Sequence, residues 1–186
     1  MNLVQPIRNR EKLEDLKEEL KKKGTRDYML FYTGLTTGIR VSDIVKLNVD
    51  DVREPNGVMK LHITIIEKKT KKVKRFPLCN GLRIEMEKYI KNMKQGEYLF
   101  KSRNGENKPI TTTQAYRIIT RAGNKLGIKE IGTHTMRKTF GYFHYKQFKD
   151  EAVLQTIYNH SSASITLKYI GISQDEIDTS YENFSI

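Results

Sequence analysis

Apolar residues at helical spacing dominate the first fifty positions. Leucines recur three and four residues apart over residues 13–20, and Gly24 stands where the C-cap of that helix is expected. Thr25 is the expected N-cap of a second helix, which ends in a turn at residues 36–38. A short helix is expected to follow over residues 39–47.

The pattern changes to a two-residue period at Met59, from which apolar side chains alternate through Ile65. Such alternation predicts a half-buried strand with one face on the core. A basic turn, Lys68 to Lys72, leads to a second strand through Phe76 and Leu78. The segment therefore predicts a β-hairpin with an almost entirely cationic tip.

Helical spacing returns in the second half of the chain. It appears over residues 82–90, after a threonine cluster at residues 111–113, from Thr133, and in shorter stretches after Asp150 and Ser162. The expected fold class is therefore α+β, mostly α-helical with a small antiparallel β-sheet.

Composition favours one domain that binds a polyanion. The four prolines are scattered and no Gly/Ser-rich linker is present, so residues 1–186 are expected to form a single domain. Lysine and arginine number 34 against 22 aspartates and glutamates, a net charge of +12. This excess favours nucleic acid first and an anionic membrane surface second, although the basic residues form no single amphipathic stripe. No apolar run could span a bilayer and no signal peptide is recognisable, so we expect a cytoplasmic protein with no membrane partner.

Nothing in the sequence supports a metal centre or a cofactor. Its single cysteine, Cys79, excludes an intramolecular disulfide, and structural zinc sites usually use two or more thiolates. The four histidines have neither the spacing of a ligand pair nor a cysteine pair nearby. We therefore expect no metal ion.

Two arginine-containing segments are candidates for phosphate binding. Arg40 and Asp43 lie three residues apart after a glycine-containing turn, where a guanidinium could grip a phosphate and the carboxylate could orient it. An ordinary surface ion pair is the alternative. His134 and Arg137 follow Thr133, the expected N-cap, on the first turn of a helix, where free backbone amides also attract anions. A solvated helix start would show the same spacing.

The cationic hairpin and two residues near the C-terminus complete the candidates. The hairpin could contact DNA phosphates, and one of its lysines could donate a proton. His160 and Tyr169 lie nine residues apart, although a lone histidine or a lone tyrosine in an apolar helix is more often structural. The hairpin cations are Lys68, Lys69, Lys71, Lys72, Lys74 and Arg75.

Taken in order, these candidates resemble the catalytic motifs of the tyrosine recombinase (phage integrase) family. Three segments carry the likeness: TGIRVSD at residues 37–43, HTMRKTF at residues 134–140, and NHSS at residues 159–162, followed by Tyr169. Each motif alone is weak, but all of them in register are specific. The resemblance extends from about residue 11 to residue 169 and implies the catalytic-domain fold of that family.

The resemblance also implies a role for each residue. Arg40 and Arg137 would clamp the scissile phosphate, and Tyr169 would attack it to give a 3′-phosphotyrosine and a free 5′-hydroxyl. Lys69 would protonate the leaving oxygen, although several lysines share the hairpin tip. His134 would bind the phosphate and help to manage the tyrosine proton, His160 would be a further phosphate ligand, and Asp43 would support Arg40. The other hairpin cations and Lys138 would contact double-stranded DNA. The chemistry would need neither a metal ion nor another cofactor, so it would proceed in EDTA.

The sequence departs from the family pattern in small and large ways. Asn159 stands where glycine usually precedes the histidine, and Lys138 stands where histidine is common; Asn tolerates the left-handed conformation that glycine would adopt. The N-terminal DNA-clamping domain of many members is expected to be absent, since the motifs begin by residue 40. The acidic amphipathic tail, residues 173–186, is expected to pack either on a neighbouring protomer of a DNA-bound tetramer or on its own domain.

Two other functions share these features. A DNA-binding module with the same fold would bind DNA without forming a covalent adduct. A protein resembling type IB topoisomerases would relax supercoils as a monomer without site preference. The target site and the outcome, whether integration, excision, inversion or dimer resolution, are not encoded in any readable base contact.

Overall fold

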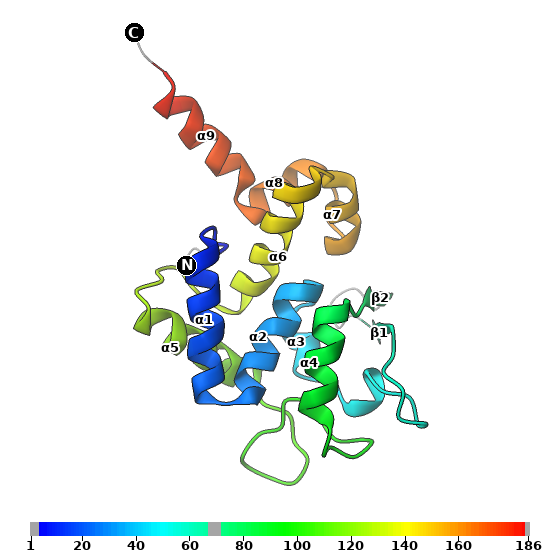
Figure 1. The fold of residues 1–186 in the computed structure, drawn as a ribbon. Helices are drawn as coiled ribbons and strands as arrows, with labels where there is room; N and C mark the ends of the chain where they lie inside the picture. The colour runs from blue at the N-terminus through cyan, green and yellow to red at the C-terminus, as the bar shows by residue number, and fades with distance from the viewer. Residues whose placement is uncertain (1–3, 67–71, 185–186) are drawn as a thin grey trace.

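The computed structural model describes residues 4–66 and 72–184. The described part is mostly helical with one two-stranded antiparallel sheet, as the sequence predicts (Figure 1). In chain order the elements are α1 (Arg10–Lys23), α2 (Thr25–Thr37), α3 (Val41–Ile44), the 3-10 helix η1 (Val49–Asp51), β1 (His62–Ile66), β2 (Val73–Pro77), α4 (Asn80–Ile90), α5 (Thr112–Lys125), α6 (Thr133–Phe148), α7 (Glu151–Tyr158), α8 (Ala163–Ile170) and α9 (Ile172–Glu182).

Short polar side chains begin several of the helices as expected. The Thr111 hydroxyl accepts from the backbone of Gln114, whose side chain accepts from Thr111 in return, so this capping box begins α5. Asp150 and Ser162 cap α7 and α8, each through one side-chain hydrogen bond. The prediction that Thr25 caps α2 is wrong, because Gly24 occupies the cap and Thr25 is the first helical residue. A glycine there serves both helices, since its φ of 143° lets the chain reverse between them.

The sheet is a single hairpin in which His62 lies opposite Pro77 and Ile66 opposite Val73. Ile63 and Phe76 face the core and are 0% and 5% exposed. The prediction that the strand begins at Met59 with Leu61 on its buried face is wrong, since the ladder begins at His62 and Leu61 is 60% exposed. The tip of the hairpin, residues 67–71, lies outside the described residues.

Two apolar cores meet along α6. The larger core contains residues of the helices from α1 through α5 and of the sheet, and Met136 of α6 also belongs to it. The smaller core lies between α6, α7 and α8 and is built around Tyr142, Leu154 and Tyr158. Burying a side chain of this size stabilises the fold by roughly 1.5–3 kcal/mol, so each core fixes the helices around it. The part of α6 from Met136 to Tyr142 therefore lies where the two cores meet.

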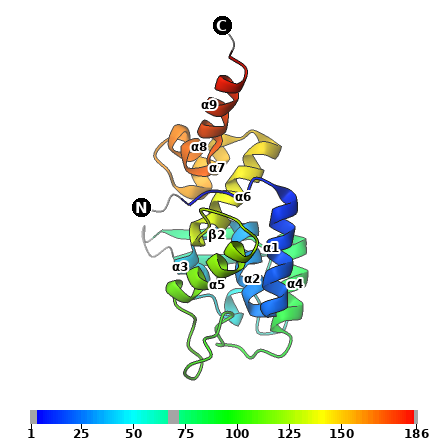
Figure 2. The same ribbon diagram turned by 90° about the vertical axis from the view of Figure 1, so that its left-hand side faces the viewer.

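The last helix, α9, extends away from both cores in the two views (Figures 1 and 2). Its base is anchored, because Ile172 is 2% exposed and Asp175 pairs with Arg8 at 2.8 Å. Its outer half is exposed, with Ile177, Tyr181 and the following Phe184 at 49%, 79% and 70%. Neither core covers the apolar face of its outer half.

Candidate active site

The predicted catalytic residues come from three parts of the fold. Arg40 and Asp43 lie at the start of α3, directly after α2. His134 and Arg137 occupy the first turns of α6, and His160 and Tyr169 lie before and within α8. Helix α6 packs against both α2 and α8, and this packing brings the three parts together.

Arg137 is the buried centre of the site. It is 3% exposed, and its guanidinium donates to the carbonyl oxygens of Gly38 and, at 3.3 Å, Tyr158. It also lies 4.1 Å from the centroid of the Tyr158 ring, whose hydroxyl donates to the Arg137 carbonyl at 2.6 Å. A buried charge requires such partners, since an unpaired one is costly. These hydrogen bonds hold the guanidinium in place before any ligand arrives.

Gly38 makes the approach of Arg137 possible. Its φ of 64° lies in the left-handed region and ends α2. A Cβ on Gly38 would lie 2.6 Å from a ring carbon of Phe140, so a larger residue would require the Phe140 ring or α6 to shift. The turn thus presents a carbonyl to Arg137 and leads at once to Arg40, which is partly exposed.

Tyr169 is half-buried and lies beside His134. The Tyr169 hydroxyl is 3.2 Å from Nδ1 of His134. Its ring packs edge-on against those of Tyr158 and His160, with centroids 5.5 and 5.2 Å apart, and Lys138 lies 5.2 Å from its centroid on another side. These neighbours fix the ring while its hydroxyl stays next to a titratable base.

The electrostatics of the pair favour a protonated tyrosine and a neutral histidine. Burial raises the pKa of Tyr169, against the opposing attraction of Arg137 and Arg40. Desolvation, followed by the charges of Arg137 and Lys138, lowers the pKa of His134. Neutral His134 is therefore able to accept the phenol proton at 3.2 Å when its Nδ1 is unprotonated.

His160 is held by its own loop. Its Nδ1 lies 3.0 Å from the Thr166 hydroxyl, and its backbone amide donates to Gln155 at the end of α7. Asn159 has a φ of 54°, which confirms that asparagine adopts the left-handed conformation expected before this histidine.

Two of the described hairpin cations contact the end of α7 or the residue that follows it. Lys74 donates to the carbonyl of Ile157 at 2.7 Å, at the carbonyl end of α7, where a cation is favoured. Lys72 lies 3.5 Å from the side chain of Asn159. Arg75 instead lies 2.9 Å from His62 on the neighbouring strand. Lys68, Lys69 and Lys71 lie outside the described residues, so the roles expected for them stay predictions.

Tyr158 is the residue that the motif analysis missed. It is fully buried and contacts Arg137, His160 and Tyr169 at once. Burial also raises its pKa, so it acts as a neutral packing and hydrogen-bonding group. Its position directly before Asn159 and His160 is the signal that could have identified it, but ten tyrosines in the chain obscure it.

Neither a metal site nor a membrane span appears in the described part of the chain. Over residues 4–66 and 72–184, no three histidine, cysteine, aspartate or glutamate side chains are grouped so as to hold an ion. Within the same ranges, no helix combines the length and the apolar character needed to cross a bilayer.

Solved structures with the same fold are recombinases. A crystal structure of XerA recombinase matches with a TM-score of 0.74 at 23% identity, covering 97% of this chain and 67% of that one. A XerH site-specific recombinase bound to its palindromic difH substrate matches with a TM-score of 0.71 at 21% identity, covering 88% and 48%. At these identities the likeness concerns the fold, which is that of a tyrosine recombinase catalytic domain.

Sequence comparison extends the likeness from fold to family. The phage integrase family model matches residues 9–176. A probable integrase/recombinase, YoeC of Bacillus subtilis, is 47% identical over 99% of this chain and 98% of its own length. Tyrosine recombinase XerA of Pyrococcus furiosus is 25% identical over 95% of this chain, which spans only 60% of that relative. The chain belongs to the phage integrase family, as a tyrosine recombinase catalytic domain.

Proposed function

We propose that this chain breaks and rejoins double-stranded DNA at specific sites through a covalent bond between Tyr169 and a backbone phosphate. The observation that carries the proposal is the 3.2 Å approach of the Tyr169 hydroxyl to His134, beside the buried guanidinium of Arg137. A phenol, a base and a fixed cation at one place are the groups that attack on phosphorus requires. Family membership supports the same chemistry.

The proposed step balances in atoms and charge. The Tyr169 oxygen forms a bond to phosphorus while its proton passes to His134, and the bond to the 5′-oxygen breaks. Lys69 protonates that leaving oxygen, giving a 5′-hydroxyl and a 3′-phosphotyrosine. Attack by a 5′-hydroxyl then reverses the step, and the energy of the phosphate ester is retained for rejoining.

The cations stabilise the phosphate during that step. Arg137 is aimed by the Gly38 and Tyr158 carbonyls, and Arg40 leaves the adjoining turn toward the same site. Asp43, 6% exposed, supports Arg40 from the following turn, and His160 is a further phosphate ligand. Charge that develops on the phosphate oxygens is stabilised by these preorganised donors, without a metal ion or a cofactor in the proposed mechanism.

The DNA partner is favoured by the charge and by the relatives. The net charge of +12 attracts a polyanion, and the XerH and λ integrase structures with this fold are complexes with DNA. The hairpin cations and Lys138 are the proposed phosphate contacts around the site. Because the substrate is DNA, we place the protein in the cytoplasm.

A DNA-bound homotetramer is the proposed assembly, with residues 173–186 packing on a neighbouring protomer. The exposed apolar side chains of α9, which projects from the rest of the chain, support this part of the proposal (Figure 1). An unchanged mass after deletion of residues 173–186 would remove the support for packing between free protomers.

A suicide-substrate assay tests the proposed chemistry. Wild-type protein and Tyr169→Phe are incubated in EDTA with nicked duplexes, drawn from a mixture of sequences, and SDS-resistant protein–DNA adducts are scored. An adduct with the wild type alone supports the proposal. Equal DNA binding by both proteins without any adduct favours a non-catalytic DNA-binding module instead.

A further inference from the structure

Tyr158 is the last residue of α7, where the end of that helix meets α6. The last carbonyl groups of a helix have no partner within it. In α7, the carbonyls of Ile157 and Tyr158 accept instead from side chains of other elements. Lys74 of β2 donates to the first at 2.7 Å, and Arg137 of α6 donates to the second at 3.3 Å. Two cations therefore hold the end of α7, as the helix dipole favours, and one of them is the proposed phosphate ligand Arg137.

Tyr158 and Arg137 exchange two hydrogen bonds. The Arg137 guanidinium donates to the Tyr158 carbonyl, and the Tyr158 hydroxyl donates to the Arg137 carbonyl at 2.6 Å. The guanidinium carbon also lies 4.1 Å from the centroid of the Tyr158 ring, a distance at which a cation and an aromatic face attract each other. Burial raises the pKa of Tyr158, so its hydroxyl keeps the proton that it donates. The Arg137 side chain therefore lies against a ring that is itself bonded to the Arg137 backbone.

The same ring contacts the nucleophile. The Tyr169 ring packs edge-on against it, with centroids 5.5 Å apart and planes inclined by 74°. The His160 ring lies 5.3 Å from it. Because one rigid ring contacts both Arg137 and Tyr169, the distance between the cation and the phenol depends on where the Tyr158 ring lies.

Gly141 leaves the space that the Tyr158 hydroxyl occupies. It lies on α6 one turn after Arg137, in the interior of a helix, where glycine is destabilising relative to alanine. A Cβ at this position would overlap the Tyr158 hydroxyl oxygen and would lie 2.7 Å from Cγ2 of Ile170, on the helix that carries Tyr169. The glycine thus allows α7 and α8 to pack closely on α6 (Figure 1).

We propose that Tyr158 is a positioning residue for DNA cleavage, whose ring sets the Arg137 guanidinium and the Tyr169 phenol relative to each other and whose hydroxyl fixes that ring on α6. This inference rests on the proposed function, since it concerns the step in which Tyr169 attacks phosphorus. Tyr158 itself neither binds the phosphate nor exchanges a proton in that step. It contributes to the rate of the step, because groups that must meet in line react much more slowly when one of them is displaced.

The test compares Tyr158→Phe and Tyr158→Leu with the wild type and with Tyr89→Phe. Phenylalanine keeps the ring and loses the hydroxyl, whereas leucine loses both. Tyr89 is a matched control, because its hydroxyl also donates to a backbone carbonyl, that of Leu99, and its ring also packs on an aromatic neighbour, Phe100. It lies on α4 against the larger core, so Tyr89→Phe removes the same kind of bond away from the site.

Single-turnover adduct formation is measured with nicked duplex at saturating DNA, below the melting temperature of each variant. Tyr158→Phe should slow it roughly tenfold, since one buried hydrogen bond is lost. Tyr158→Leu should slow it by about 100-fold, since the ring that separates the two groups is gone. DNA affinity should change little in both, and Tyr89→Phe should react at the wild-type rate despite a similar loss of stability. If Tyr158→Leu does not fold, the comparison of Tyr158→Phe with Tyr89→Phe decides.

Spectra of the ¹⁵N-arginine-labelled protein without DNA test the arrangement apart from the chemistry. The aromatic ring against the Arg137 guanidinium should displace its Nε–H signal from the range of the other arginine side chains. This signal should move in Tyr158→Phe and lose its displacement in Tyr158→Leu. In Tyr89→Phe it should match the wild type.

Three results would overturn the proposal. The first is adduct formation that Tyr158→Phe slows no more than Tyr89→Phe does. The second is an Arg137 signal that is the same in the Tyr158 variants as in the wild type. The third is a loss of DNA affinity that accounts for the slower reaction, which would make Tyr158 a residue of the binding surface. Failure of the wild type to form any adduct would count against Tyr169 chemistry alone, because the Arg137 signal is measured without cleavage.

Discussion

The guanidinium of Arg137 donates a hydrogen bond to the backbone carbonyl of Gly38, across a separation of 99 residues. This bond links the turn that carries Arg40 directly to the helix that carries His134. The other terminal nitrogen of Arg137 donates to the carbonyl of Tyr158, whose ring also contacts Tyr169. One buried side chain therefore helps to set the relative positions of Arg40, His134 and Tyr169.

Arg137→Lys should disrupt this arrangement even though lysine keeps the positive charge. An ammonium group lacks the planar fork that reaches two carbonyls, so the Gly38 and Tyr158 oxygens lose their donors. We expect adduct formation to slow by at least about 100-fold and the melting temperature to fall. Single-turnover adduct formation and thermal unfolding would measure both effects. Arg83→Lys is the control, because Arg83 lies on α4 and its guanidinium donates to Asn80. Wild-type rates in Arg137→Lys would contradict the role of the fork.

Substitution of Gly38 by alanine is expected to be unusually costly. Its φ of 64° alone disfavours a side chain, and the added Cβ would meet Phe140 at 2.6 Å. Gly57 is a matched control, because its φ is also positive at 89° and nothing lies within 4 Å of its Cβ position. Gly57→Ala should destabilise the fold by about 1 kcal/mol, and Gly38→Ala by clearly more. Equal losses in urea unfolding would show that α6 accommodates the methyl group.

Adduct formation should depend on the protonation of His134. Its pKa is lowered by desolvation and by the nearby cations, so the neutral base is present above that lowered value. As the pH falls through it, His134 becomes protonated and loses its ability to take the Tyr169 proton, and the rate should fall. The midpoint is therefore expected below the ordinary histidine value of 6.5. His134→Gln should be roughly 100-fold slower and lack this limb of the pH profile. A profile that keeps the limb in His134→Gln would assign it to another group.

Tyr169→Phe should separate binding from chemistry. Removing the hydroxyl leaves the ring packing against Tyr158 and His160 intact, so folding and DNA affinity should change little. The covalent adduct should vanish, because no other described tyrosine lies beside His134 in the same way. Gel retardation and denaturing electrophoresis of the same samples would measure both quantities. Adduct formation by Tyr169→Phe would place the nucleophile elsewhere.

Arg8 is expected to hold the turn between α8 and α9, which follows Tyr169, rather than to stabilise the whole fold. It pairs with Asp175 at 2.8 Å and donates to the Gly171 carbonyl at 3.3 Å, just beyond the helix that carries Tyr169. The pair is partly exposed, so Arg8→Ala should cost less than about 1 kcal/mol of stability. Adduct formation should slow severalfold in Arg8→Ala, and Arg8→Lys should restore part of the rate. An unchanged rate in Arg8→Ala would show that the turn between α8 and α9 keeps its position without this ion pair.

The sequence by itself determined most of the helices, the two strands of the hairpin and the candidate site residues. Helical and alternating periods are local consequences of which face is buried, so residues 13–20 and the strand around Ile63 were predictable. The motifs around Arg40, His134 and Tyr169 were recognisable because they occur together in order. The first residue of each helix was less predictable. Gly24 and Gly132 occupy the N-cap positions that were expected at Thr25 and Thr133, because cap geometry depends on how neighbouring helices meet.

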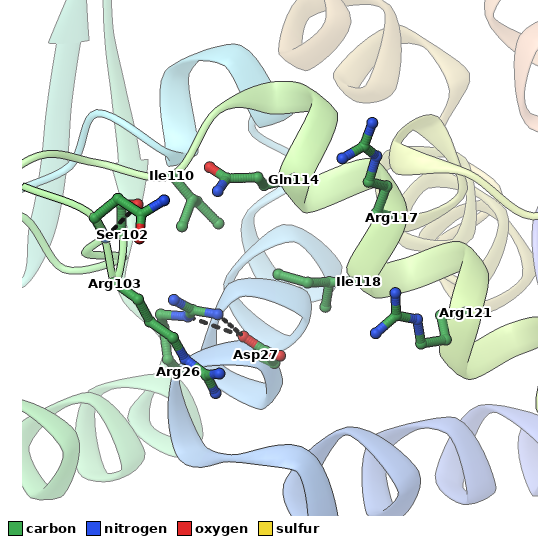
Figure 3. A pocket seen from close by; sticks show the side chains of 10 residues that line it. Arg26, Asp27, Ser102, Arg103, Ile110, Gln114, Arg117, Ile118 and Arg121 are labelled. Atoms are coloured by element: carbon green, nitrogen blue, oxygen red, sulfur yellow. Dashed lines mark hydrogen bonds and ion pairs between the residues drawn. The ribbon is translucent and has the colours of Figure 1, made fainter.

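Only the tertiary structure decided how these groups meet. Tyr158 had no motif of its own, and it touches Arg137 and Tyr169 because α7 and α8 fold back onto α6. Arg26, Arg103, Arg117 and Arg121 line one pocket (Figure 3) although they come from α2, α5 and the segment between α4 and α5, so no local window could have grouped them. Periodicity records which residues are buried, whereas packing between distant segments decides which buried and charged groups touch.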